Sequence, residues 1–346
     1  MSSEFKPSIF SRTERFSIVR LLLLALIPSV SGLAMDWKPS PGLMSLFADE
    51  VPAALRGVHR IVFLGDSITQ AGDYVTDFDC WLVSRGINIE VLNLGLASET
   101  AADLTEAENQ GHKKGNGFGR PFLSQRLDRV LAETKSDLIF ACYGMNDGGS
   151  LPAGEAGTKR YADAITHLRD AALKAGVKRV ILCTPPVQDS KGNASQQVHD
   201  ENLTRYSLWL ESKKNEGWEV VDIHGPMRAK LDERRAKDSN FVLANDGVHP
   251  GREGHWLMAT CILNQFIGTK VDPNSSAEHL FKTNGEEIRK LVNLRMKTLF
   301  SAWMSKIGHT RPGVPGGPGS KLGLTIGEAS AKAADITKRI EQKNHD

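Results

Sequence analysis

The chain has 346 residues, of which 40% are hydrophobic and 24% are charged, and it carries a net charge of +2. This composition is ordinary for a soluble protein, and the length allows one large domain with an appendage or two small domains. Because the charge is close to neutral and the sequence has no long basic run, nothing in it indicates a nucleic-acid partner.

The first 34 residues have the layout of a secretory signal peptide. A basic stretch precedes a short apolar core at 21–27, and small residues follow at 28–34. An uncleaved membrane anchor is the alternative, but this apolar core is too short to span a bilayer comfortably. We therefore expect cleavage near residues 32–34, export to the periplasm or the extracellular space, and no stable membrane insertion afterwards. The basic residues are Lys6, Arg12, Arg15 and Arg20.

Between residues 59 and 266, strand-like and helical patterns alternate along the chain. Apolar, β-branched runs predict the strands, and amphipathic runs predict the helices. The predicted strands are 59–64, 87–93, 136–143, 178–183 and 218–222. The predicted helices are 75–83, 123–132, 158–175, 196–215, 224–236 and 251–266. This alternation favours an α/β fold with a central parallel sheet of about five strands and helices on both faces.

The segment 98–120 departs from that pattern. Its beginning, 98–104, predicts a short helix, whereas 109–120 is rich in glycine and basic residues. Such a stretch could cradle a phosphate, but its glycine spacing matches neither of the phosphate-binding loop motifs. We expect a solvated connecting loop. It follows the end of a strand directly, so it can form part of the rim of a pocket.

Residues 271–346 predict a helical C-terminal extension. Helical patterns cover 287–304 and 325–343, and the Gly/Pro-rich stretch 308–320 between them predicts a loop. This extension contains no motif that indicates chemistry. We therefore expect it to pack on the core.

The four cysteines give no sign of a metal site. They are Cys80, Cys142, Cys183 and Cys261, and none lies in a Cys-x-x-Cys pair or has a histidine at zinc-ligand spacing. Cys142 and Cys183 lie in apolar strand-like runs and are expected to be buried thiols. Cys80 and Cys261 lie in helical patterns that could share a face of the sheet. An exported protein permits a disulfide between them, but free thiols are the interpretation that we favour.

Polar residues follow the predicted strands at the edge where ligands bind in parallel sheets. Ser67 follows the first strand within Gly-Asp-Ser, Gly95 follows the second and Asn146 follows the third. Asp246 and His249 precede the last helix of the alternating region. A single serine after a strand is more often a turn or cap residue. Because the carboxyl ends of parallel strands share one edge, however, we expect all five residues to converge.

This set of residues suits acyl transfer at a serine. Ser67 is the predicted nucleophile, and His249 is the predicted base that takes its proton. Asp246 would fix the tautomer of the imidazole and stabilise its protonated form. The backbone N–H groups of Ser67 and Gly95 and the side-chain amide of Asn146 would form the oxyanion hole.

In order along the chain, these residues resemble the four sequence blocks of the SGNH/GDSL hydrolase family. The blocks are Gly65-Asp66-Ser67, Asn93-Leu94-Gly95, Gly144-Met145-Asn146-Asp147 and Asp246-Gly247-Val248-His249. Ile68 stands where the nickname of the family has leucine, and Ser98 stands where a second glycine often follows. The resemblance covers about 58–268. It implies a flavodoxin-like three-layer α/β/α sandwich, a hydrolase domain over 35–270, and no cofactor or metal.

The resemblance also implies esterase, lipase, thioesterase or carbohydrate-deacetylase activity. We expect an exported serine esterase for small acyl esters, and O-acetyl groups of a carbohydrate are the substrate that we favour. The substrate would thus be a small-molecule or carbohydrate ester. A lipolytic esterase, a thioesterase or an acyltransferase is the alternative on the same residues. From a different class, the alternative is a catalytically silent cell-envelope or carbohydrate-binding protein.

Overall fold

The computed structural model describes residues 51–189 and 193–345. The predicted signal peptide, 1–34, lies outside the described residues, as do the first residues of the predicted hydrolase domain. The described residues belong to one compact unit.

Five parallel strands form one sheet, in the order β2-β1-β3-β4-β5. The strands are β1 (Arg60–Gly65), β2 (Glu90–Asn93), β3 (Leu138–Cys142), β4 (Arg179–Cys183) and β5 (Glu219–Val221). Almost all of their residues are buried, as is usual for a parallel sheet covered on both faces. This is the flavodoxin-like strand order, and it confirms the predicted fold class. The order reverses between β1 and β3, and ligands bind at such a point beside the carboxyl ends of the strands.

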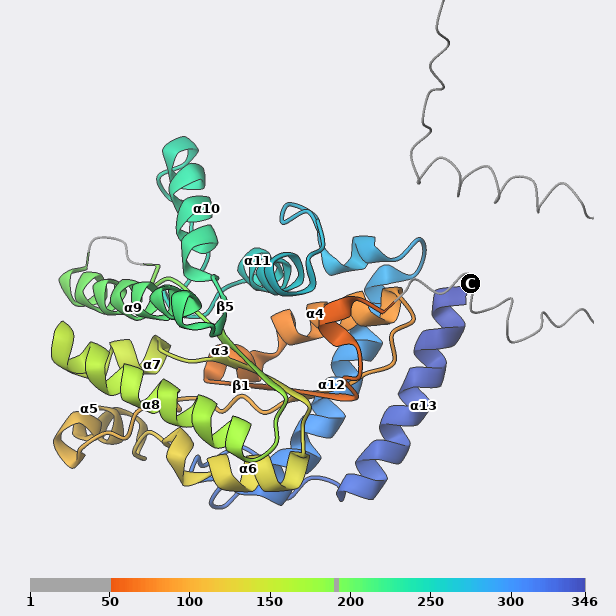
Figure 1. The fold of residues 1–346 in the computed structure, drawn as a ribbon, viewed down its shortest axis with the longest axis horizontal. Coiled ribbons are helices and arrows are strands. Elements are labelled where there is room, and N and C mark those ends of the chain that lie inside the picture. Colours follow the sequence, from red (N-terminus) through yellow and green to blue (C-terminus); the bar gives the residue numbers. More distant parts are fainter. Residues whose placement is uncertain (1–50, 190–192, 346) are drawn as a thin grey trace, which may run out of the picture. The chain divides into compact units, whose positions relative to one another are not determined.

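Helices cover both faces of the sheet (Figure 1). The helices are α3 (Ser67–Ala71), α4 (Asp73–Ser84), α5 (Glu106–Asn116), α6 (Leu127–Thr134), α7 (Met145–Gly148), α8 (Glu155–Lys174), α9 (Ala194–Ser212), α10 (His224–Lys237), α11 (Arg252–Ile262), α12 (Gly285–Ile307) and α13 (Ile326–His345). On one side, α4 packs against α11 and α12; on the other, α8 packs against α6, α9 and β4. The strands and helices predicted for the alternating region are thus present, with their ends shifted by a few residues; the short helix predicted at 98–104 is not.

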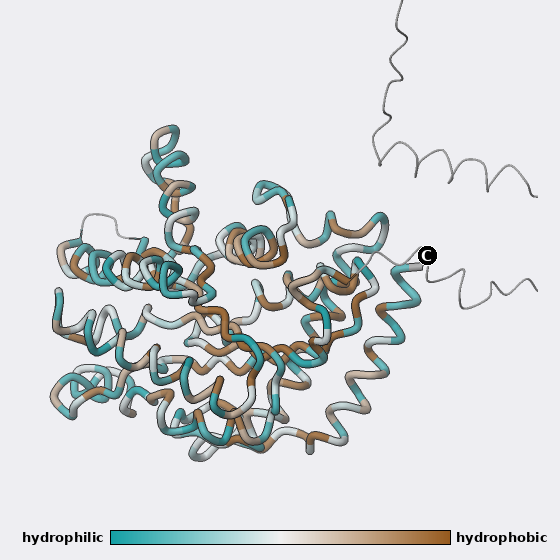
Figure 2. The backbone as a smooth tube through the Cα atoms, in the orientation of Figure 1, coloured by the Kyte–Doolittle hydropathy of each residue, from teal (hydrophilic) through white to brown (hydrophobic). Residues whose placement is uncertain are grey.

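Aromatic side chains fill the centre of the sheet. Phe63 of β1 stacks on Phe140 of β3 with ring centroids 4.8 Å apart, and Phe78 of α4 meets both rings edge-on. Figure 2 shows hydrophobic residues concentrated in the central strands. Burial of rings of this size is a large part of the hydrophobic stabilisation of a core, and here it fixes the two strands that lead to the candidate site.

The expectation for 98–120 is wrong in detail. Residues 98–104 are irregular, with an isolated bridge from Thr100 to Phe122, and the glycine-rich part lies in helix α5 as far as Asn116. A capping box explains why the helix begins where it does: Thr105 Oγ1 accepts from the N–H of Glu108, and the Glu108 carboxylate accepts from the N–H of Thr105. The helix is polar, with hydrophilic residues over most of its length (Figure 2), and among its side chains only Asn109 is buried.

All four cysteines are free and buried. The disulfide considered between Cys80 and Cys261 is therefore absent from the structure. Burial raises the pKa of the Cys80 thiol well above its usual range and that of Cys261 to about 12. Both side chains accordingly act as small apolar groups in the core.

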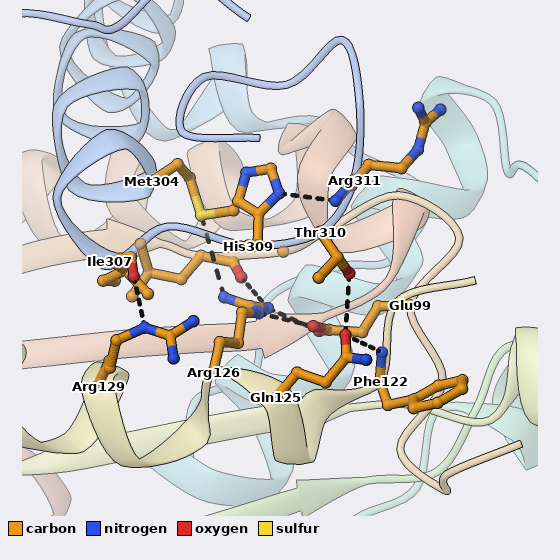
Figure 3. Close-up of polar contacts among 12 residues, drawn as sticks. Glu99, Phe122, Gln125, Arg126, Arg129, Met304, Ile307, His309, Thr310 and Arg311 are labelled. Atoms are coloured by element: carbon orange, nitrogen blue, oxygen red, sulfur yellow. Dashed lines mark hydrogen bonds and ion pairs between the residues drawn. The ribbon is translucent and has the colours of Figure 1, made fainter. Parts of the chain in front are cut away.

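The C-terminal extension packs on the core, and the stretch 308–320 is a loop, as predicted. Helix α12 contacts α4 and β2, and α13 lies along α12. Arg295 of α12 pairs with the buried Asp79 of α4 at 2.9 Å. The end of α12 is fixed by Arg129 of α6, which donates to the carbonyls of Ile307 and Gly308 at 2.7 and 3.0 Å (Figure 3).

Candidate active site

Ser67 lies at the carboxyl end of β1, as the sequence predicted, and it begins a short helix, α3. Asp66 caps this helix, and its carboxylate accepts from the N–H of Ile68 at 3.0 Å. As the first residue of a helix, Ser67 has a backbone N–H without an acceptor inside the helix. That N–H is therefore available to a ligand beside the serine hydroxyl.

Ser67, His249 and Asp246 lie in one hydrogen-bonded chain. The Ser67 hydroxyl donates to His249 Nε2 at 2.8 Å, and His249 Nδ1–H donates to Asp246 Oδ2 at 2.7 Å. Ser67 and His249 are 182 positions apart in the sequence. The histidine and aspartate side chains are 49% and 57% exposed, so the site is open to solvent. This geometry suits a serine activated by an oriented imidazole.

The turn between Asp246 and His249 holds the aspartate in place. Asp246 Oδ1 accepts from the backbone N–H groups of Val248 and His249 at 2.9 and 2.8 Å. Partial burial acts to raise the pKa of Asp246, but the hydrogen bonds from the His249 and Val248 backbone and from the imidazole lower it to about 2. The carboxylate is thus ionised throughout the neutral range, as its role beside an imidazole requires.

A buried aspartate, Asp189, supports this turn and was missed from the sequence. Its carboxylate accepts from the N–H groups of Leu243 and Ala244 at 2.7 and 3.1 Å, and its own N–H donates to the carbonyl of Gly247 at 2.8 Å. The Asp189 carboxylate also forms an ion pair with Arg235 of α10. Asp189 comes 46 positions before Arg235 and more than 50 before Leu243 and Ala244, and no spacing motif links them.

Gly95 lies where the sequence placed it, and the structure leaves no room for a side chain there. A Cβ at this position would lie 2.3 Å from the backbone N of Gln70 and 2.6 Å from the carbonyl carbon of Thr69. Glycine is therefore required by the close approach of α3 rather than by a substrate. The Gly95 N–H donates to Asn93 Oδ1 at 2.9 Å. As an oxyanion donor, this N–H would have to be shared with or released from Asn93.

Asn146, in α7, is held on both sides of its amide. Its Nδ2 donates to the carbonyl of Glu99 at 2.9 Å, and its Oδ1 accepts from Arg120 Nη1 at 2.7 Å. An amide nitrogen carries two hydrogens, so one remains available to an oxyanion. These contacts fix the amide orientation that the predicted role demands. Neither Glu99 nor Arg120 was recognised from the sequence.

Behind Asn146, the side chain of Glu99 forms a buried ion pair with Arg126 (Figure 3). The two groups are 0% and 1% exposed, and both oxygens of Glu99 accept from Arg126 at 2.6 Å. The Tyr143 hydroxyl also donates to Glu99 at 2.6 Å, and Arg126 Nη2 donates to the carbonyl of Leu94 at 2.8 Å. The segment from Leu94 to Glu99, which includes Gly95, is thus tied to the core.

Two further buried carboxyl groups lie close to the site. Burial raises the pKa of Asp66 to about 7 and that of Asp147 to about 6. Hydrogen bonds oppose this shift, from Ile68 N–H to Asp66 and from the N–H groups of Ala101 and Ala102 to Asp147. Asp147 therefore ties the segment after Glu99 to α7.

Within the described ranges, 51–189 and 193–345, no group of three or more His, Cys, Asp or Glu side chains is arranged to hold a metal ion. Over the same part of the chain, no helix combines the length and apolar character needed to cross a bilayer.

Comparisons with known proteins give one family match and several similar solved structures. Residues 63–257 match the GDSL-like Lipase/Acylhydrolase family. A gut microbial diltiazem-metabolizing enzyme is 24% identical, with a TM-score of 0.49, and the match covers 60% of this chain and 47% of that one, about half of its length. Axe2, an acetylxylan esterase from Geobacillus stearothermophilus, is 21% identical over 61% of this chain and 95% of its own, with a TM-score of 0.43. No curated protein matches the chain.

Proposed function

Since the chain belongs to the GDSL-like lipase/acylhydrolase family, we propose that it is a serine esterase that works through an acyl-enzyme on Ser67. Family membership and the class of ester hydrolase are as predicted from the sequence. The observation that carries the proposal is the chain of hydrogen bonds from Ser67 through His249 to Asp246, at 2.8 and 2.7 Å.

In the first half of the reaction, Ser67 Oγ attacks the carbonyl carbon of the ester and its proton passes to His249 Nε2. The carbonyl oxygen becomes an oxyanion, which would accept hydrogen bonds from the Ser67 N–H and from Asn146 Nδ2. The Gly95 N–H joins them if it leaves Asn93. When the tetrahedral intermediate collapses, His249 returns the proton to the departing alcohol oxygen, and the acyl group stays on Ser67.

In the second half, a water molecule gives a proton to His249 Nε2 and attacks the acyl carbonyl. Collapse releases the carboxylic acid, and the proton returns to Ser67 Oγ. Throughout both halves, Asp246 stays ionised and orients the imidazole through Nδ1. A hydroxyl of a sugar that replaced this water would make the protein an acyltransferase with the same residues.

We propose small acyl esters, with O-acetyl groups of a carbohydrate as the favoured class, as the substrate. Two observations support an ester of a small acyl group with a polar alcohol. Helix α5, which precedes Arg120 on the oxyanion side, has polar residues where a lipase would carry an apolar lid. The half-exposed His249 and Asp246 leave the site open to a bulky hydrophilic alcohol.

The proposal is tested by labelling the folded protein with a fluorophosphonate and by measuring 4-nitrophenyl esters of increasing chain length. We expect an adduct on Ser67, none in Ser67→Ala, and normal labelling in Ser212→Ala, which changes a serine in α9. We also expect acetate to be hydrolysed faster than octanoate. The absence of an adduct would favour the silent binding protein, and a preference for octanoate would favour the lipolytic esterase. Acetylated oligosaccharides then test the carbohydrate, with sugar acceptors added to detect acyl transfer.

Export is part of the same proposal, and it rests on the sequence of residues 1–34. Expression of the full chain in a bacterial host, followed by N-terminal sequencing of secreted material, tests it. Retention of residues 21–27 in that material would contradict cleavage.

A further inference from the structure

Arg120 brings a positive charge to the candidate oxyanion hole. It follows α5, and its guanidinium donates through Nη1 to Asn146 Oδ1 at 2.7 Å and to the carbonyl of Ser98 at 3.3 Å. Its backbone is fixed by Asn109, whose amide oxygen accepts from the Arg120 N–H at 2.7 Å. The guanidinium is thus held one side chain away from the predicted position of the oxyanion.

The guanidinium of Arg120 has no carboxylate partner within the described residues, and its Nε and Nη2 atoms form no hydrogen bond there. Three other arginines near the core are paired with carboxylates: Arg126 with Glu99, Arg289 with Asp77, and Arg295 with Asp79. The carboxyl groups of Asp147 and Asp66 are the ones whose charges act on Arg120. Both are buried and already accept backbone hydrogen bonds.

A second arginine, Arg311, lies close to α5, the helix that precedes Arg120. Desolvation and the charges of Arg120 and Arg311 lower the pKa of His112 in α5 to about 4. The Arg311 guanidinium lies 4.0 Å from the centre of the Phe118 ring, two residues before Arg120. Its Nε is buried without a hydrogen-bond partner in the described part of the chain. Arg120 and Arg311 therefore both lie near His112, and within 51–189 and 193–345 neither forms an ion pair with a carboxylate.

We propose that this side of the site binds an anionic group, a carboxylate or a sulfate, carried by the ester substrate, with Arg120 as the principal contact. The inference rests on the proposed esterase function and narrows its substrate class. The Nε–Nη2 edge of a guanidinium presents two parallel N–H donors, which match the two oxygens of a carboxylate. Because Nη1 is already used by Asn146, this free edge is the one left for a ligand.

The same anionic group could lie on the acyl part or on the alcohol part of the ester, and paired substrates distinguish the two. On the alcohol side, 4-carboxyphenyl acetate is compared with its neutral methyl ester. On the acyl side, mono-4-nitrophenyl succinate is compared with methyl 4-nitrophenyl succinate. We expect the wild-type protein to favour the anionic member of one pair in kcat/KM, and this preference should fall as salt is added.

The decisive variant is Arg120→Gln, measured against both members of each pair. We expect kcat/KM for the favoured anionic ester to fall about 10- to 100-fold more than for its neutral partner, the range of a lost charged hydrogen bond. Arg120→Lys should restore part of the preference, and Arg311→Gln should reduce it less than Arg120→Gln. Lys114→Gln, which removes an exposed positive charge from α5, should leave the ratio unchanged.

Two results would overturn the inference. If Arg120→Gln lowered kcat/KM equally for the anionic and neutral esters, Arg120 would only position Asn146. If the wild-type protein showed no preference for an anionic ester in either pair, no anionic subsite would exist. Failure of the proposed function itself looks different, because neutral esters would then not be hydrolysed and Ser67→Ala would change nothing.

Discussion

The carbonyl oxygen of Glu99 accepts a hydrogen bond from Asn146 Nδ2 at 2.9 Å, so the backbone of one residue orients the side chain of the other. The carboxylate of the same Glu99 is buried and paired with Arg126. A candidate oxyanion donor is therefore connected through one residue to an ion pair in the core. A substitution in that ion pair should therefore change the catalytic rate, although neither charged group is among the predicted catalytic residues.

Glu99→Gln should weaken both the fold and the reaction. It leaves Arg126 without its counter-charge, and breaking a buried ion pair from one side typically costs about 3–5 kcal/mol. In the protein that stays folded, we expect kcat to fall more than KM changes, because the Asn146 amide loses its fixed orientation. Urea unfolding and steady-state kinetics measure the two effects. The exposed pair Glu286–Lys290 is the control, and Glu286→Gln should change neither. An unchanged kcat in folded Glu99→Gln would contradict the connection.

Asp246→Asn should remove most activity while keeping the turn intact. The amide oxygen can still accept from the N–H groups of Val248 and His249, as Oδ1 does now. The amide nitrogen, however, would face Nδ1 of His249 and favour the wrong tautomer. We expect kcat to fall by about 10³- to 10⁴-fold, with an unchanged thermal midpoint. A variant that kept more than a tenth of the activity would show that the aspartate is not needed as the partner of His249.

Asp189→Asn tests the support of the Asp246–His249 turn. The substitution keeps one acceptor but removes the charge that pairs with Arg235 and binds the N–H groups of Leu243 and Ala244. We expect a loss of about 1–3 kcal/mol in unfolding free energy and a lower rate of fluorophosphonate labelling. Asp232→Asn, in α10, serves as the matched control. Equal labelling rates in Asp189→Asn and the wild type would show that Asp189 supports the turn without affecting the reactivity of Ser67.

Asp66→Asn should change how stability depends on pH. The pKa of Asp66 is raised by burial from 3.8 to about 7, so the folded protein holds this proton to higher pH than the unfolded chain does. The stabilisation from this proton is complete below pH 3.8 and is lost as the pH rises to about 7. Asparagine keeps the cap to Ile68 N–H and has no charge to bury.

The stability of Asp66→Asn relative to the wild type should therefore increase between pH 4 and pH 7 and then level off. Urea unfolding at pH 5, 6, 7 and 8 measures this difference. A difference that stayed constant over that range would show that Asp66 has an ordinary pKa in the folded protein.

Ser98→Gly should stabilise the protein slightly. Ser98 has a φ of +70°, in the left-handed region that favours glycine. Glycine relieves this strain, but it also has greater conformational freedom in the unfolded chain. The net increase in unfolding free energy should be up to about 1 kcal/mol. Ser98→Val should be destabilising, because a β-branched side chain is strained there. Thermal unfolding of both variants measures the effect, and a lower midpoint for Ser98→Gly would rule out strain at this position.

The sequence was sufficient to predict the sheet and the meeting of Ser67 with His249. Continuous apolar runs indicated parallel strands, and parallel strands bring their carboxyl ends to one edge. The local geometry near the site was harder to predict from the sequence. The glycines of 109–120 indicated a loop, whereas the capping box of Thr105 and Glu108 begins a helix there. Helix propensity is a property of single residues. It does not include the hydrogen bonds that a capping box adds at the start of a helix.

The supporting residues could not be predicted for a different reason. Asp189 binds backbone N–H groups more than 50 positions away, and a backbone group leaves no mark in the sequence. Arg126 and Glu99 are an ordinary pair of charged residues until the fold buries both. Such contacts depend on tertiary packing alone, and they became visible only with the structure.

The contact between Ser67 and His249 joins the first strand of the sheet to the last turn before α11, across 182 positions. A chain still emerging from the ribosome, or one threaded unfolded through a membrane, possesses the nucleophile long before it possesses the base. The proposed hydrolysis therefore requires that these two distant parts of the chain have come together. Esterase activity can thus report complete folding of this region, and it offers a sensitive assay for refolding experiments in which partly folded species contribute no signal.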